Sequence, residues 1–247
     1  MTEIAAPLKG VQAVVLDTDG VITDSARVHA AAWKSAFDAF LRAYPPQDPE
    51  QRGPFDAHKD YLRYVDGMSR LDGAASFLAS RGLRPSDTEV RSVAAQKEAV
   101  FVERLRRGGI AAYPGTVRLL HALSRAGVGL AAASASRHAR ELIERAGLLD
   151  VFDAVVDGGE AARLHLPGKP DPALFLEAAR RLGRTPRDTA VVEDALAGVE
   201  AGRRGGFGLV VGVDRTGTDG MGVRLRRHGA DIVVRDLGDL LLEGAPS

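Results

Sequence analysis

The architecture of this chain can be inferred from one segment, Val11-Gln12-Ala13-Val14-Val15-Leu16-Asp17-Thr18-Asp19-Gly20. Its first six residues are mostly apolar and rich in β-branched side chains, and the apolar run stops abruptly at Asp17. A short apolar run of this kind is typical of a strand that is buried on both faces of a parallel sheet. The segment therefore predicts a buried strand that ends in a loop carrying two aspartates.

Apolar runs of similar length recur along the chain, and helical patterns separate them. Further strands are expected at residues 128–133, 154–156, 190–192, 207–211 and 232–234. Residues 116–126 have an apolar stripe typical of a helix, and Asp171, Pro172 and Gly183 mark the ends of another. Strands that alternate with helices favour a parallel sheet covered on both faces. The predicted fold class is α/β, with a doubly wound parallel-sheet (Rossmann-like) core.

One stretch breaks this alternation, because residues 25–107 contain helical patterns and no strand pattern. Helices are expected at residues 26–41, 60–65, 71–81 and 88–107, with a proline-rich loop at 44–54. We therefore predict an inserted all-helical cap domain at 25–107, within an α/β catalytic core made of residues 1–24 and 108–247. The hinges are expected near residues 23–25 and 108–112.

Composition narrows the classes of partner. The 247 residues are 45% hydrophobic, enough for one large core or for a core and a smaller domain. Lys plus Arg and Asp plus Glu both total 33, so neither nucleic acid nor a membrane is an expected partner. The absence of cysteine excludes disulfides and sulfur-based zinc sites. With no secretory pattern and no apolar run near about eighteen residues, we expect a cytoplasmic protein, and we expect a monomer.

The candidate functional residues follow the predicted strands. Ligands of an open parallel sheet bind at the carboxyl ends of its strands, so the polar residues there are the candidates. They are Asp17, Asp19, Ser134, Ser136, Lys169, Glu193 and Asp194. The set offers carboxylates for a cation, hydroxyls for phosphate oxygens and one positive charge. Since a phosphate monoester repels a carboxylate unless its charge is offset, the set predicts Mg²⁺ as the cofactor.

Each group also has a plainer interpretation when it is taken alone. Asp-x-Asp-Gly can be only a turn, the serines can be loop hydroxyls, Glu193-Asp194 can cap a helix, and Lys169 can be a solvated surface charge. Their joint placement at one edge of the sheet favours the functional interpretation. The six histidines show no metal-ligand spacing, and there is no P-loop or Gly-x-Gly-x-x-Gly motif.

Four segments carry a family resemblance that covers nearly the whole chain: Asp17-Thr18-Asp19-Gly20-Val21-Ile22-Thr23-Asp24, Ser134-Ala135-Ser136, Gly168-Lys169-Pro170-Asp171-Pro172 and Glu193-Asp194-Ala195-Leu196-Ala197-Gly198. Through them the chain resembles the haloacid dehalogenase-like superfamily, and within it β-phosphoglucomutase and the related sugar-phosphate phosphatases. The resemblance implies that Asp17 is the nucleophile and Asp19 the general acid and base, and that Ser134, Ala135 and Lys169 hold the phosphoryl group. It also implies that Mg²⁺ is bound by the Asp17 carboxylate, the Asp19 carbonyl and Asp194, with Glu193 nearby or also ligating.

The resemblance extends into the insertion. His29 and Trp33 match cap positions of β-phosphoglucomutase, Arg70 would clamp a second phosphate, and Ser136 would also contact substrate. The plainer alternative is that His29 and Trp33 form an i, i+4 pair on one helix face and that Arg70 is solvated. The chain departs from the mutase pattern where Asp66 replaces a lysine, and where Glu98 and His138 replace asparagines. The added negative charge at Asp66 should weaken the grip on a doubly phosphorylated sugar.

The implied function is Mg²⁺-dependent phosphoryl transfer on a small phosphorylated sugar through an aspartyl-phosphate intermediate. The first interpretation is a β-phosphoglucomutase-like enzyme that interconverts β-glucose 1-phosphate and glucose 6-phosphate. The close alternative is a sugar-phosphate phosphatase, in which water accepts the phosphoryl group. A third alternative is a non-catalytic phosphosugar-binding protein on the same fold.

Overall fold

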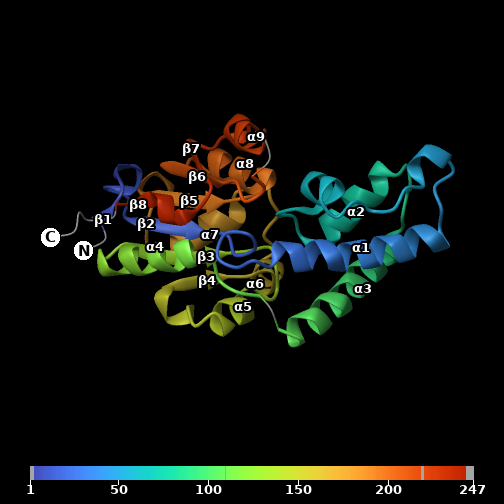
Figure 1. Ribbon diagram of the computed structural model, residues 1–247, viewed down its shortest axis with the longest axis horizontal. Coiled ribbons are helices and arrows are strands. Elements are labelled where there is room, and N and C mark those ends of the chain that lie inside the picture. Colours follow the sequence, from blue (N-terminus) through green and yellow to red (C-terminus); the bar gives the residue numbers. More distant parts are fainter. Residues whose placement is uncertain (1–2, 109, 218–219, 243–247) are drawn as a thin grey trace. The chain divides into compact units, whose positions relative to one another are not determined.

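The computed structural model describes residues 3–108, 110–217 and 220–242 (Figure 1). The chain forms two compact units, one made of Met1–Asp24 and Ala111–Ser247 and the other of Ser25–Ile110. The sequence places the second boundary at residue 107, whereas the inserted unit extends to Ile110. The difference arises because the returning chain first bonds to the core at Ala111, whose carbonyl accepts from the Asp24 N–H at 2.9 Å.

The first unit contains a parallel sheet of six strands. They are β2 (Ala13–Leu16), β3 (Gly129–Ala133), β4 (Ala154–Val156), β5 (Thr189–Glu193), β6 (Leu209–Val213) and β7 (Ile232–Val234). Their order in the sheet is β4-β3-β2-β5-β6-β7, and every neighbouring pair is parallel. The chain moves outward from β2 on one side and then returns to build the other side from β5. The point where the order reverses therefore lies between β2 and β5, where such sheets bind their ligands.

Helices and short helical turns connect these strands. The α-helices of this unit are α4 (Pro114–Arg125), α5 (Ala139–Arg145), α6 (Gly158–Arg163), α7 (Ala173–Arg181), α8 (Leu196–Arg204) and α9 (Met221–His228). The 3-10 turns are η1 (Ala6–Leu8), η4 (Leu149–Val151), η5 (Pro186–Asp188) and η6 (Leu237–Leu240). A separate two-stranded antiparallel sheet pairs β1 (Glu3–Ile4) with β8 (Leu241–Leu242). The predicted α/β class is thus confirmed.

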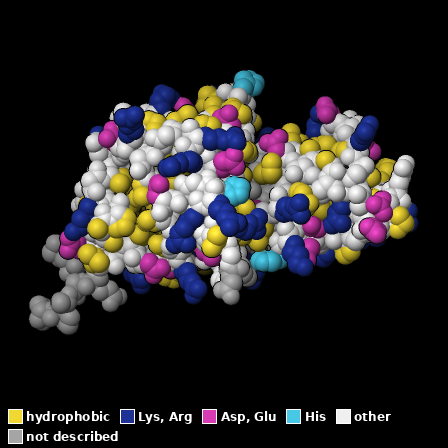
Figure 2. Space-filling view, turned by 90° about the horizontal axis from the view of Figure 1, so that it is seen from above, with side chains coloured by type: hydrophobic (Ala, Val, Ile, Leu, Met, Phe, Trp, Pro, Cys, Tyr) yellow, Lys and Arg dark blue, Asp and Glu magenta, His cyan; other side chains and the backbone are white. Residues whose placement is uncertain are grey.

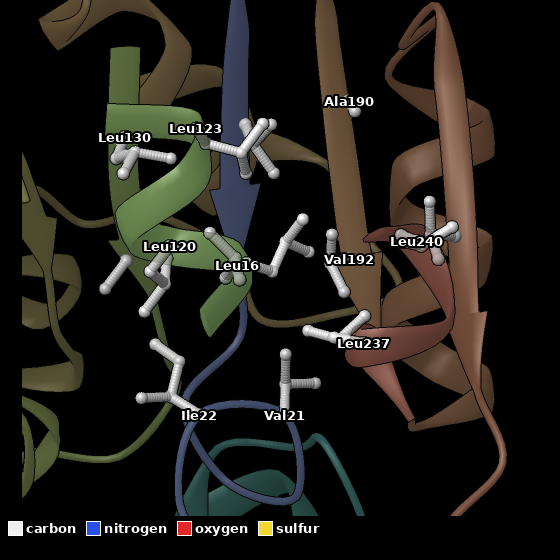
Figure 3. Packing of buried hydrophobic residues seen from close by; sticks show 14 of the residues in the cluster. Leu16, Val21, Ile22, Leu120, Leu123, Leu130, Ala190, Val192, Leu237 and Leu240 are labelled. Carbon is white, nitrogen blue, oxygen red and sulfur yellow. The ribbon is translucent and has the colours of Figure 1, made fainter. Parts of the chain in front are cut away.

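The core of the first unit fixes the strand from which the Asp17 loop departs. Leu120 and Leu123 of α4 are fully buried, as is Leu16 of β2, and all three belong to one apolar cluster (Figure 3). Val21 and Ile22, in the loop after β2, are buried in the same cluster. Each buried side chain of this size contributes roughly 1.5–3 kcal/mol relative to an exposed one. The loop after β2 is therefore anchored by packing on both sides of the aspartates.

The second unit has its own core, and its described residues form helices, turns and loops without a strand. Its helices are α1 (Ala26–Ala43), α2 (Arg70–Ser80) and α3 (Asp87–Arg106), with a 3-10 turn η2 (Pro49–Gln51) and a π-helical turn η3 (Tyr61–Val65). Phe37, Phe55 and Phe77 are fully buried, with ring centroids 4.2 Å apart for Phe37 and Phe77. The predicted helical insertion is confirmed, and α1 lies along α3 (Figure 1).

Several element boundaries differ by one or two residues from the sequence-based prediction, and two of these differences concern β6 and α7. The strand predicted at 207–211 is found at Leu209–Val213, because Phe207 packs edge-on against Phe175 and Gly208 lies in a tight contact with the Arg187 carbonyl. The helix expected to follow an Asp171 cap begins at Ala173, with Pro172 as the flanking residue. Asp171 still bonds to the helix start, because its Oδ1 accepts from the Ala173 N–H at 2.9 Å.

The face of the molecule shown in Figure 2 carries charges of both signs on its described residues. Lys and Arg side chains lie interspersed with Asp and Glu on the face shown in Figure 2, in keeping with equal totals of 33 each. Among the described residues, none of the helices combines the length and the apolar character needed to cross a bilayer.

Candidate active site

The loop after β2 presents Asp17 at the carboxyl edge of the sheet. The Asp17 N–H still donates to the Val192 carbonyl at 3.0 Å, so its backbone continues the sheet pairing. The Asp17 side chain turns back on the loop, and its Oδ2 accepts from the Asp19 N–H at 2.8 Å. Gly20 then reverses the chain with φ of 84° and donates its N–H to the Thr23 carbonyl at 2.8 Å. Only glycine adopts this backbone conformation readily, so the loop holds both aspartates in a fixed place.

Lys169 reaches Asp17 from the loop that precedes α7. Its Nζ lies 2.6 Å from Asp17 Oδ1 and also contacts Glu193 Oε1. The residue is only 2% exposed, and its ammonium lies 4.7 Å from the centre of the Phe175 ring. This burial excludes the alternative that Lys169 is a solvated surface charge. One ammonium is thus shared by two buried carboxylates.

Burial and the neighbouring charges shift the pKa values of Asp17 and Lys169. Burial raises the pKa of Asp17 to about 8; the Lys169 ammonium opposes that shift, while the Glu193 and Asp19 carboxylates add to it. Burial alone would lower the pKa of Lys169, but the carboxylates of Asp17 and Glu193 outweigh it and the pKa is raised. Lys169 is therefore held as a cation, and one such cation does not balance the surrounding carboxylates. A further cation would be stabilised there.

The loop after β3 brings a hydroxyl to the same place. Ser134 is 1% exposed, and its Oγ donates to Asp19 Oδ2 at 3.4 Å and accepts from the Ser136 N–H at 3.1 Å. The Ser136 carbonyl accepts from the Gly158 N–H at 3.0 Å, and a Cβ at Gly158 would lie 2.2 Å from the Ala135 carbonyl oxygen. These contacts fix the loop at residues 134–136, with the Ser134 hydroxyl beside the second aspartate.

Glu193 is fully buried at the end of β5, and both of its oxygens have partners. Oε1 contacts the Lys169 ammonium, and Oε2 accepts from the Ala195 N–H at 2.7 Å. The carboxylate lies against α8, where a Cβ at Gly198 would be 1.7 Å from Oε1. The helix therefore needs a glycine at this position to let the carboxylate approach. In this arrangement Glu193 orients Lys169.

Asp194 lies against the loop that carries the other two aspartates. A Cβ at Gly20 would be 1.8 Å from Asp194 Oδ2, so only the bare glycine backbone admits this carboxylate. Asp17 and Asp194 thus reach the same loop from adjacent strands. Carboxylate and carbonyl oxygens are the ligands that Mg²⁺ takes in proteins, usually one or two carboxylates together with water. The donor set and its excess of negative charge fit such an ion.

That fit involves two carboxylates and a backbone carbonyl, with Glu193 nearby rather than as a further ligand. Within the described ranges 3–108, 110–217 and 220–242, no group of three or more His, Asp or Glu side chains could hold a metal together. Glu193 is the member of the predicted set that is turned away, towards Lys169 and α8. Asp17, Asp194 and the carbonyl of Asp19 stay as the candidate ligands.

The candidate cap residues belong to the second unit. His29 is 7% exposed, stacks on Phe101 at 4.1 Å between ring centroids, and pairs its Nδ1 with the Lys97 ammonium at 2.8 Å. Trp33 is 4% exposed and stacks on Phe37 at 4.8 Å. Both side chains therefore pack in the interior of this unit, as the plainer interpretation of an i, i+4 pair expects. Their contact with substrate stays a prediction.

Arg70, the predicted phosphate clamp, is not a solvated side chain. It is the first residue of α2, and its Nη1 lies 2.8 Å from Oε2 of Glu98 on α3. Both side chains are 24% exposed. An ion pair between two helices, partly shielded from water, holds the guanidinium in one place more firmly than a fully exposed pair would.

Sequence reasoning missed Arg215, which follows β6. Its Nε donates to the Gly20 carbonyl at 3.2 Å, its Nη1 donates to Asp236 Oδ2 at 2.7 Å, and its guanidinium lies 3.8 Å from the centre of the Tyr113 ring. Arg215 therefore ties the loop that carries Asp17 and Asp19 to Asp236. The rule of inspecting polar residues after each strand could have found it, but the predicted strand ended at residue 211, two residues too early.

A site with these features belongs to the class of enzymes that transfer phosphoryl groups. The comparisons with known proteins support the same class of enzyme. The chain belongs to the haloacid dehalogenase-like hydrolase family, whose sequence model matches residues 11–206. It is an enzyme of the phosphotransferase and phosphatase type found in that family, which weighs against a non-catalytic phosphosugar-binding protein. The predicted resemblance is thereby confirmed.

Individual proteins and solved structures of this family are similar to the chain over nearly its whole length. The chain is 42% identical to β-phosphoglucomutase of Mycobacterium bovis over 240 residues, which is 94% of this chain and 92% of that protein. A hydrolase from Pseudomonas syringae has a similar structure, with a TM-score of 0.76, 28% identity and coverage of 93% of this chain and 95% of that one. β-Phosphoglucomutase from Clostridium difficile matches with a TM-score of 0.71, 25% identity and 93% coverage of both chains.

Proposed function

We propose that this enzyme transfers a phosphoryl group of a small phosphorylated sugar through Asp17, most closely in the manner of a β-phosphoglucomutase. The observation that carries the proposal is the Asp17 carboxylate at the carboxyl edge of the sheet. Lys169 holds one of its oxygens at 2.6 Å and the Asp19 N–H holds the other at 2.8 Å. A carboxylate fixed in this way is preorganised to attack phosphorus in line.

The proposed reaction has two halves. An Asp17 carboxylate oxygen forms a bond to phosphorus as the bond to the sugar oxygen breaks, and Asp19 gives its proton to that leaving oxygen. Asp19, now a carboxylate, takes the proton of the acceptor hydroxyl, which attacks the aspartyl phosphate and releases Asp17. Ser134, the Ala135 backbone and Lys169 would bear charge on the transferring group, which is where most catalysis of a loose transition state arises.

The same residues are proposed to hold Mg²⁺. The Asp17 and Asp194 carboxylates and the Asp19 carbonyl would bind the ion, which when present offsets the charge between carboxylate and phosphate. Glu193 is proposed to position Lys169, because both of its oxygens are already engaged. A cytoplasmic location and a monomeric state also stay predictions.

Removal of divalent metal is expected to abolish activity. With two carboxylates facing a dianionic phosphate, the repulsion is not offset by Lys169 alone, so turnover should fall by at least about 100-fold after EDTA and dialysis. Adding back MgCl₂ should restore it and should also raise the melting temperature of the protein. Undiminished turnover in metal-free buffer would contradict the assignment of these ligands.

The molecule that accepts the phosphoryl group from Asp17 decides whether the enzyme acts as a mutase or as a phosphatase. Effective molarities on the order of 10⁵ M let a well-held sugar hydroxyl outcompete water, and the 42% identical mutase favours that outcome. The expected result, with β-glucose 1-phosphate and a trace of glucose 1,6-bisphosphate, is glucose 6-phosphate in large excess over free phosphate. If phosphate is the sole product, the mutase proposal is wrong and the phosphatase stands, an outcome that Asp66 and the Arg70–Glu98 pair favour.

A further inference from the structure

The cap carries a guanidinium that the chain itself neutralises. Arg70 begins α2 and Glu98 lies on α3, and the 2.8 Å contact between them joins two packed helices. Because each side chain is 24% exposed, water screens the pair less than it screens a fully exposed one. Any other anion that binds Arg70 must compete with a carboxylate that is already in place.

Two further acidic residues, Asp66 and Asp72, lie close to Arg70 in the chain. Ser69 caps α2 by accepting from the Asp72 N–H at 3.3 Å, and its hydroxyl donates to Asp72 Oδ2 at 2.6 Å. Asp66 ends the π-helical turn that leads into this loop. A helix start favours an anion, but here Asp72 already occupies the first turn. A phosphate dianion that binds at this helix start would therefore meet the Asp72 carboxylate as well as the Arg70–Glu98 pair.

We propose that Glu98 is a specificity-determining residue, which holds Arg70 in an internal ion pair that a distal phosphate of the substrate has to displace. The inference rests on the proposed function, in which Arg70 receives that phosphate. A phosphate can displace the carboxylate because it offers several acceptor oxygens to the guanidinium, whereas a neutral hydroxyl cannot. Glu98 thus lowers the preference for substrates with two phosphates over substrates with one.

Removing the charge of Glu98 should therefore increase the affinity for a substrate with a distal phosphate and not for a substrate without one. Glu98→Gln keeps the size of the side chain but frees Arg70 for a phosphate. The affinity for glucose 1,6-bisphosphate should rise relative to that for phenyl phosphate, which has no distal phosphate. We expect the ratio of KM for phenyl phosphate to KM for the bisphosphate to increase by about tenfold. Glu98→Asn removes the same charge and should shift the ratio in the same direction.

The matched control is Glu103→Gln, which removes a carboxylate of the same helix that pairs with Arg107 at the surface. This variant should leave the ratio of KM values at the wild-type level. An unchanged ratio in both Glu98 variants, or an equal shift in Glu103→Gln, would overturn the proposal. In the double variant Arg70→Ala/Glu98→Gln the gain should disappear. A gain that persists without Arg70 would show that Glu98 acts by another route, which also overturns it.

Failure of the proposed function can be told apart from failure of this inference. If the wild-type protein turns over neither compound, the proposed function fails. The affinity of glucose 1,6-bisphosphate can still be measured by calorimetry in an Asp17→Asn background. Tighter binding after Glu98→Gln would support the ion-pair competition, and equal or weaker binding would refute it.

Discussion

Asp17→Asn is expected to lower kcat by about 10⁴-fold or more, because an amide cannot form the acyl phosphate that divides the reaction into two steps. The fold should survive the change. Burial raises the pKa of Asp17 to about 8, which means that the folded protein disfavours the charged form, and asparagine has nearly the same shape without the charge. The measurement is steady-state turnover of β-glucose 1-phosphate, together with the melting temperature.

The control for this variant is Asp153→Asn. Asp153 accepts from the Leu130 N–H at 2.9 Å at the start of β3, the opposite end from the carboxyl edge of the sheet. The same chemical change there should leave kcat near the wild-type value. Turnover by Asp17→Asn above about one tenth of wild type would sink the nucleophile assignment, since covalent catalysis by this carboxylate would then be dispensable.

Lys169→Met should damage both activity and stability. The methionine fills a similar volume but leaves the Asp17 and Glu193 carboxylates facing each other without an ammonium. Losing one partner of a buried ion pair typically costs about 3–5 kcal/mol of unfolding free energy. Losing a positive charge that stabilises the transferring phosphoryl group typically costs about 10²–10³ in kcat. Chemical denaturation and steady-state kinetics measure the two effects.

The stability deficit of Lys169→Met should depend on pH in a particular direction. Without the ammonium, the pKa of Asp17, which burial already raises in the folded state, rises further there and stays ordinary in the unfolded state. A raised folded pKa gives stability that is present below the unfolded value and is lost as the pH rises through the folded value. The deficit should therefore be nearly constant from pH 5 to pH 7 and should grow above pH 8, where Asp17 ionises in the wild-type protein but stays protonated in the variant. Lys9→Met, which removes a surface partner of Glu3, serves as the control and should show no such dependence.

The sheet was predictable because its strands are buried on both faces and leave continuous apolar runs. Residues 154–156 and 232–234 were predicted at their observed bounds. The strand at Leu209–Val213 was misplaced because Phe207 and Gly208 precede it in the apolar run without joining the strand, and because Gly212 interrupts the run before the strand ends. The pairing of β1 with β8 could not be predicted, since strands of two residues leave no periodic signal.

The candidate site was also predictable only in part. The placement of polar residues after each strand predicted which side chains gather at the carboxyl edge, because that edge follows from topology alone. What it could not predict is how each carboxylate is oriented. Glu193 and Asp194 are neighbours in sequence, yet one turns to Lys169 beneath α8 and the other turns to Gly20. That choice depends on two glycines in other elements, which no local pattern reveals.

The two chain segments that join the insertion to the core are bonded to each other. Asp24 donates to the Ala111 carbonyl, Tyr113 donates to the Ile22 carbonyl at 3.0 Å, and Thr23 forms an antiparallel bridge with Ala112. The inserted unit, Ser25–Ile110, is therefore a long loop of the core whose two ends are already held together by these hydrogen bonds. Lengthening a closed loop adds only a slowly growing entropic cost. The helices of the inserted unit can therefore be lengthened, trimmed or exchanged over evolutionary time as a module, while Asp17 and Asp19 stay in register.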